Sequence, residues 1–171
     1  VSLTGANAGD SRYGTVGFLG CISVAQGTLL AATSGSLGAN TSIDVANGAT
    51  LNISTYSPTI GALTGQANGT VLLNSDLKIG IVGCTSSSTY GGMFKGNGSL
   101  SKEGLGTLTL SGDNSNFNGN ITVINGTLAA ASSNALGSVV GKTILSANTT
   151  LDIQNTAIGA ENLTLNNNTT L

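Results

Sequence analysis

The stretch Leu100 to Ala130 reads LSKEGLGTLTLSGDNSNFNGNITVINGTLAA and decides the fold. Leu108 and Leu110 alternate with threonine and serine, and Ile121 and Val123 alternate with asparagine and threonine. This alternation at every second position is typical of β-strands that bury one face. Between the two segments lie mainly Gly, Asp, Asn and Ser, which favour turns. The stretch therefore predicts short strands joined by tight corners.

The same pattern recurs along the whole chain. Its marker is an apolar residue after Gly-Thr, Ala-Thr or Thr-Thr, and it occurs at Leu29, Leu51, Val71, Leu108, Leu128, Leu151 and Leu171. Most successive markers are about 20 residues apart, a spacing at which repeated units stack on one another. Strands this short need a neighbouring copy on which to bury their apolar face. We therefore interpret each interval as one coil, and the long interval from Val71 to Leu108 as two coils whose shared marker is lost.

A longer period lies over the short one. The residues that recur 99 positions later are Val24, Gly27, Thr28, Leu29, Leu37 and Gly38, which return as Val123, Gly126, Thr127, Leu128, Leu136 and Gly137. This offset predicts an internal duplication, with residues 1–99 and 100–171 as its blocks. No linker or change of composition separates them, so we expect residues 1–171 to be a single domain. The chain starts in a strand-like Val-Ser-Leu and stops on a marker, which predicts a fragment of a longer polypeptide.

Coils of about 20 residues, each with two or three short strands, stack as a parallel β-helix. The fold class that we predict is all-β: a right-handed parallel β-helix (solenoid) of about eight coils. Leu, Ile, Val and Ala would point inward, and Thr, Ser and Asn outward. The low aromatic content, 4%, fits a narrow interior. A barrel or a sandwich also has many short strands, but neither explains a marker that returns at such regular intervals.

Composition limits the possible partners. Charged residues make up 7% of the chain, against about 25% in ordinary domains, and the five basic residues are scattered. There is thus no cationic stripe for nucleic acid or anionic lipid. No apolar run approaches the roughly 18 residues that span a bilayer. We expect neither a nucleic-acid partner nor a membrane span.

Leu100, Lys102, Gly104, Gly106, Leu108, Leu110 and Gly112 fill the pattern L-x-K-x-G-x-G-x-L-x-L-x-G. With Asn116-Phe117-Asn118-Gly119 and the later Gly126-Thr127-Leu128, the chain resembles the autotransporter-associated β-strand repeat, also called the passenger-associated transport repeat. The resemblance is strongest over residues 100–137. It implies a segment of the secreted passenger of a type V autotransporter in a Gram-negative bacterium, exported through the outer membrane with the help of its own C-terminal β-barrel translocator.

The function expected from this resemblance is that of a structural and adhesive stalk at the cell surface or outside the cell. Such a stalk supports secretion and presents regions that bind a host-cell or matrix protein or a glycan. Two alternatives remain open at this point: a β-helix enzyme that degrades polysaccharide, and an extracellular matrix or biofilm protein without a specific receptor.

Residues for catalysis are scarce. The chain has no histidine, so it cannot build a Ser-His-Asp or Cys-His nucleophile by itself. Gly9-Asp10-Ser11 resembles the start of an esterase motif, but the histidine partner is missing. Polysaccharide lyases and glycosidases need clustered carboxylates, basic residues or calcium, whereas the carboxylates here are isolated in sequence. We expect no enzyme, no cofactor and no metal site.

Four of the six aromatic residues, Tyr13, Phe18, Tyr90 and Phe94, fall in the two irregular stretches, residues 9–20 and 83–98. Aromatic side chains exposed on loops are plausible ligand contacts. The alternative is that these rings pack the ends of imperfect coils.

Three other features have structural interpretations. We expect Lys102 and Glu103 to form a solvated pair on the outer surface, and the carboxylate of Asp113 to bond its own turn. Cys21 and Cys84 are interpreted as two buried or half-buried thiols, and a disulfide between them stays open.

Overall fold

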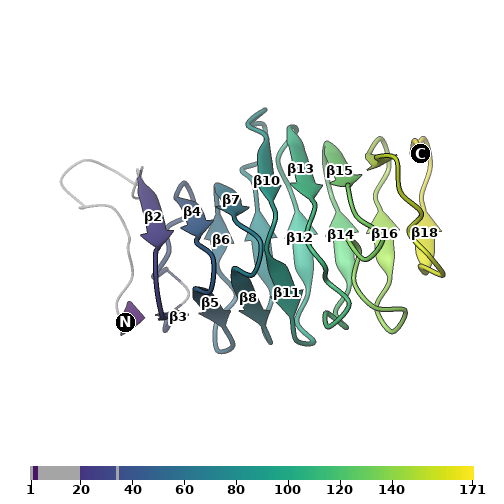
Figure 1. Cartoon of the computed structure of the whole chain (residues 1–171). Helices are drawn as coiled ribbons and strands as arrows, with labels where there is room; N and C mark the ends of the chain where they lie inside the picture. The colour runs from purple at the N-terminus through teal and green to yellow at the C-terminus, as the bar shows by residue number, and fades with distance from the viewer. Residues whose placement is uncertain (1, 4–19, 34) are drawn as a thin grey trace.

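The protein is a parallel β-solenoid of about seven coils, shown in Figure 1. The structure, a computed structural model, describes residues 2–3, 20–33 and 35–171. These residues form strands and turns without a helix, and the strands pair in parallel throughout the described chain. The prediction of an all-β parallel β-helix is confirmed, with seven coils in place of eight.

The strands form three sheets that run along the rod. Sheet A contains β1 (Ser2–Leu3), β3 (Thr28–Ala31), β5 (Thr50–Ile53), β8 (Thr70–Leu73) and β11 (Met93–Lys95). Sheet B contains β2 (Cys21–Val24), β4 (Ser42–Val45), β7 (Ala62–Gly65), β10 (Ser88–Tyr90), β13 (Thr107–Leu110), β15 (Thr127–Ala130) and β17 (Thr150–Ile153). Sheet C contains β6 (Thr59–Ile60), β9 (Leu77–Ile79), β12 (Leu100–Lys102), β14 (Ile121–Val123), β16 (Thr143–Leu145) and β18 (Leu163–Leu165).

Sheet B gives the length of each coil, because it runs through the described chain. Residues in register along it are Val24, Val45, Gly65, Tyr90, Leu110, Ala130 and Ile153. Most steps in this column are about 20 residues long, at the short end of known solenoid repeats. The longest step, from Gly65 to Tyr90, contains the loop between β9 and β10, residues 80–87. Coil length is therefore nearly constant, and the extra residues lie in a corner.

The long interval between the markers Val71 and Leu108 has a different origin from the predicted one. The markers Leu29, Leu51 and Val71 lie in sheet A, whereas Leu108, Leu128 and Leu151 lie in sheet B. Val71 pairs with Phe94 one coil later, and Leu108 follows Phe94 by less than a full coil, on β13 of sheet B, after β12 of sheet C. The interval is thus one coil plus the part of a coil that leads from sheet A through sheet C to sheet B, and the interpretation as two coils is wrong. It accounts for the extra coil in the predicted count.

Residues that match at the offset of 99 positions lie on different sheets of the solenoid. Val24 lies in sheet B, and its counterpart Val123 lies in sheet C. The corners that follow have the same backbone conformation, with φ of 70° at Gly27 and 72° at Gly126. These two corners therefore share a backbone conformation, although one joins sheet B to sheet A and the other joins sheet C to sheet B.

The core runs along the axis of the rod and consists mainly of branched aliphatic side chains. In most strands inward and outward residues alternate, as in β5, where Leu51 and Ile53 are fully buried while Thr50 and Asn52 are half-buried. Burying such a side chain contributes about 1.5 to 3 kcal/mol. Stacked coils thus share one continuous apolar interior.

Candidate functional site

The aromatic residues predicted as ligand contacts are not on the surface where the structure describes them. Tyr90 and Phe94 lie on β10 and β11 and are 0% and 1% exposed. Their predicted exposure on a loop is wrong, and the alternative, packing within an irregular coil, describes them. Tyr13 and Phe18 lie outside the described residues.

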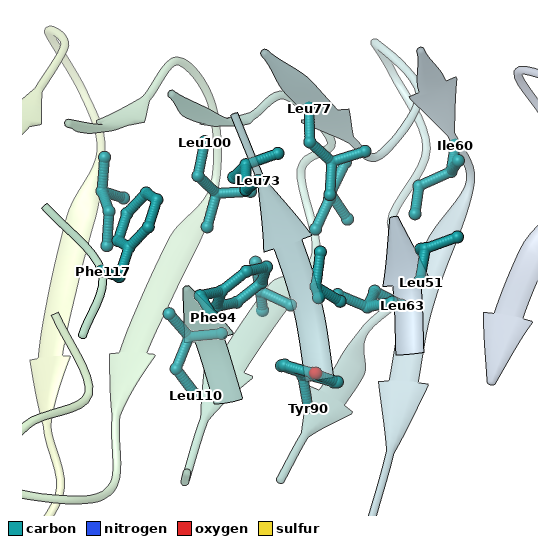
Figure 2. Packing of buried hydrophobic residues seen from close by; sticks show 14 of the residues in the cluster. Leu51, Ile60, Leu63, Leu73, Leu77, Tyr90, Phe94, Leu100, Leu110 and Phe117 are labelled. Carbon is teal, nitrogen blue, oxygen red and sulfur yellow. The ribbon is translucent and has the colours of Figure 1, made fainter. Parts of the chain in front are cut away.

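Tyr90, Phe94 and Phe117 form a row of rings inside the solenoid, which we call the aromatic row. Figure 2 shows it in the same core as Leu100 and Leu110. The ring centroids of Tyr90 and Phe94 are 4.9 Å apart, and those of Phe94 and Phe117 are 5.8 Å apart. Tilted rings at these distances attract each other beyond simple burial. The aromatic row fills a part of the core that lies across two coils.

The hydroxyl of Tyr90 is satisfied inside the core. It lies 3.1 Å from the carbonyl oxygen of Gly69, to which it can donate, and 3.3 Å from that of Met93. Burial raises the pKa of Tyr90 above its ordinary value. Gly65 and Gly92 make room for the ring, because a Cβ atom on either would lie within 2.7 Å of Tyr90 atoms. These glycines reflect close packing.

Asn114 is a buried polar residue that sequence reasoning missed. Its side-chain oxygen accepts a hydrogen bond from the backbone N–H of Phe94, at 2.7 Å, and its amide donates to the carbonyl of Ala135, at 2.7 Å. The Asn114 side chain thus bridges the coil before it and the coil after it. Asp113-Asn114 resembles an ordinary turn in sequence, so only the spatial neighbours reveal this role.

Lys102 also points inward, which corrects the predicted surface pair. It is 3% exposed, and its Nζ donates to the carbonyls of Gly104 and Asn125. Burial lowers the pKa of Lys102 to about 8. Glu103 pairs instead with Lys78, at 3.5 Å. Lys102 therefore ties two successive corners between sheet C and sheet B.

The prediction for Asp113 is confirmed. Its carboxylate accepts hydrogen bonds from the backbone N–H of Ser115 and from the side-chain amide of Asn134, both at 3.0 Å. These bonds lower the pKa of Asp113, that of the Ser115 backbone first. The residue stabilises a turn and links it to the next coil.

A shallow hollow of about 110 Å³ lies at the corner between sheets C and B. Its lining includes Ser42, Ala62, Ile81, Cys84 and Ser86. Both Cys84 and Cys21 are free and exposed, so the expectation of buried thiols is wrong. The hollow offers hydroxyl, thiol and backbone groups, and no charged side chain lines it.

The described part of the chain gives no sign of a metal centre. It holds no group of three or more His, Cys, Asp or Glu side chains placed to share an ion. In the same residues no helix has the length and apolar character needed to cross a membrane.

The corner that lines the hollow and the next two corners along the same edge carry exposed apolar side chains. Val82, Leu105 and Ile124 are 70%, 52% and 37% exposed and lie in successive connections from sheet C to sheet B. Exposed apolar side chains thus recur at this edge in three successive coils.

Comparison with known proteins points to one class. The chain is similar to the adhesin BmaC autotransporter of Brucella suis biovar 1 (strain 1330), with 36% identity over 89 residues. The matched region is 49% of this chain and 3% of that protein. No family model matches the chain, and neither does a solved structure. The fold and this similarity together fit a β-solenoid of the kind found in an autotransporter passenger.

Proposed function

We propose that this chain is a β-helical stalk segment of the passenger of a bacterial autotransporter. The similarity to an autotransporter adhesin over 89 residues carries the proposal, and the parallel β-solenoid supports it. The passenger crosses the outer membrane and stands on the cell surface or is released. The stalk holds binding regions away from the cell.

The physical properties of the fold suit this task. Neighbouring strands are about 4.8 Å apart, so seven coils make a rod about 30 Å long. Each coil contacts only its neighbours, so folding can propagate from one coil to the next. Progressive folding outside the cell would oppose backward sliding of the chain and so support export.

The adhesive role concerns a host-cell or matrix protein or a glycan. Tyr13 and Phe18 remain the proposed contacts, because Tyr90 and Phe94 are buried. No observation favours the polysaccharide-degrading alternative: the hollow lacks carboxylates, and the chain lacks histidine.

Location is tested with cells that express the full-length gene. Intact cells are treated with protease, and an antibody against this chain then follows its signal in surface, medium and cytoplasmic fractions. We expect surface signal that protease removes, or signal in the medium, while a cytoplasmic control protein stays intact. Signal confined to the cytoplasm would contradict the proposal and leave the fold untouched.

Export support is tested with two deletions. Removing residues 25–45 takes out one coil in register, because Val24 pairs with Val45, whereas removing residues 25–35 breaks the register. We expect near-native surface display for the first deletion and slow or absent display for the second. Equal display of both variants would show that stacking in register does not assist export.

A further inference from the structure

Sheet A ends in the middle of the rod, and this end is unusual. β11 is the last strand of sheet A, while sheets B and C continue through β13 and β14 to β17 and β18. The backbone N–H of Phe94, on β11, therefore faces a coil that has no strand opposite it. Buried backbone groups of this kind need another partner.

Three asparagines replace the missing strand. The side chain of Asn114 accepts the hydrogen bond of Phe94 N–H. Beside it, the carbonyl of Asn116 accepts from Gly96 N–H, and the N–H of Asn118 donates to the carbonyl of Gly96, at 3.2 and 2.9 Å. On this face the coil with β11 is thus coupled to the next by the side chain of Asn114, by a hydrogen bond of 3.2 Å from the side-chain amide of Asn118 to the side-chain oxygen of Asn97, and by the two backbone bonds of an isolated parallel bridge.

The aromatic row fills the same level of the core. Phe94 comes from β11, and Phe117 comes from the segment that crosses the face of sheet A in the next coil. Gly96 and Phe117 form an isolated parallel bridge there. Large rings thus occupy volume where the cross-section of the solenoid changes.

The repeat also changes phase at this point. Before it, the markers lie in sheet A, and after it they lie in sheet B. The end of sheet A, the aromatic row, the bridging asparagine and the change of phase therefore all fall within residues 90–117, where the coil of β10 to β12 meets the coil that begins at β13.

We propose that Asn114, Tyr90, Phe94 and Phe117 form an adaptor that couples two cooperative blocks of the solenoid. One block comprises the described coils up to β12, and the other comprises the coils from β13 onward. In stacked arrays, cooperativity depends on the coupling between neighbouring repeats. When this coupling weakens at one interface, the array unfolds in two steps. Asn114 is the part of the adaptor that makes bonds to both sides.

The test compares Asn114→Ala with the native chain and with Asn134→Ala. Asn134 is exposed and also bonds the preceding coil, through Asp113, so its variant is a matched control. Hydrogen exchange followed by mass spectrometry over a denaturant series gives separate unfolding midpoints for peptides within residues 20–90 and 107–171. We expect Asn114→Ala to separate the two midpoints and to raise exchange at the block boundary about tenfold or more, since it leaves a buried N–H and a buried carbonyl unpaired.

Asn134→Ala should leave the difference between the midpoints as in the native chain. If Asn114→Ala shifts both blocks together, or shifts neither, the adaptor does not divide the solenoid and the proposal is overturned. Should Asn114→Ala be insoluble, Asn114→Ser and limited proteolysis replace it. A resistant fragment that ends between residues 95 and 107 would then support the boundary, and digestion without such a fragment would overturn it.

Discussion

The coils before the adaptor and the coils after it both stack in register, but they contain different numbers of strands. The coils of β4 to β9 place one strand in each of the three sheets, whereas the coils of β13 to β18 place strands in sheets B and C. In the later coils the third face is crossed by turns. The comparison shows that the length of the coil and the inward positions, rather than three full strands, keep the stack in register.

The corner between sheets A and C shows how the later coils become compact. In the earlier coils, Ser57 and Ser75 share a hydrogen bond of 3.0 Å at this corner. In the coils that follow, the corresponding corner positions are Gly98, Gly119 and Gly141. A Cβ atom on each of these glycines would collide with a backbone carbonyl of the preceding coil. Backbone thus packs directly on backbone where side chains separate the earlier coils.

The largest effect is expected from Gly119→Ala. The added methyl group would collide with the carbonyl of Gly98, which cannot move without disturbing its own coil, so we expect a loss of more than about 3 kcal/mol. Gly48→Ala is the control in the earlier coils: its Cβ meets open space, and its φ of 75° alone costs roughly 1 kcal/mol. Chemical denaturation measures both. Similar losses would show that the glycine column is not sterically required.

A smaller effect is expected from Lys102→Met, which should cost about 1 to 2 kcal/mol at pH 7 because two carbonyls lose a donor. The folded pKa of about 8 lies below the ordinary 10.5, so between these values the unfolded chain binds more protons. The native chain should therefore become more stable relative to the variant as pH rises through this window. Denaturation at several pH values measures this, with Lys142→Met, an exposed site, as control. A difference that does not change with pH would contradict it.

Exchange of the repeated segment should have a still smaller effect. Residues 123–137 are placed at positions 24–38, where the matching corner has the same φ at its first glycine, so we expect a cost below about 1.5 kcal/mol. The control inserts residues 122–136 at the same place, which turns every inward side chain outward. Thermal unfolding compares the two chimeras. Equal losses would show that the segment is tied to one face of the solenoid.

No change in stability is needed to test the thiols. Because Cys21 and Cys84 are free and exposed, a thiol reagent should label two groups per native chain, and one in Cys21→Ser. Labelling that appears only after reduction would instead indicate a disulfide.

Much of the fold follows from alternation in the sequence. Leu108, Leu110, Ile121 and Val123 are all buried as their alternation predicts. Lys102 lies two positions after Leu100, so the same alternation predicts that it points inward. The expectation of a surface pair gave more weight to the charge of Lys102 than to this alternation, and it was wrong. The sheet on which each repeat marker lies could not be predicted, because it depends on which strands pair and not on the local sequence.

The aromatic residues were misplaced for a related reason. A segment with many glycines is typical of loops, yet Gly92 lies in the short connection between β10 and β11, where a side chain would collide with the carbonyl of Gly69 and with the ring of Tyr90. Glycine composition alone therefore does not distinguish an exposed loop from strands and tight turns that pack against a large ring. Asn114 was missed because its partners lie one coil before and one coil after it.

The parallel stacking described above also fixes how the protein responds to force. Strands run across the rod, so the hydrogen bonds between them point along its axis and bear axial tension directly. Pulling on an end would break one ring of bonds at a time and release one coil. With about 20 residues per coil and about 3.4 Å per extended residue, each event lengthens the chain by roughly 70 Å. The molecule would thus lengthen in regular steps under tension. The peak force at its attachment point would then be lower than in a single cooperative rupture.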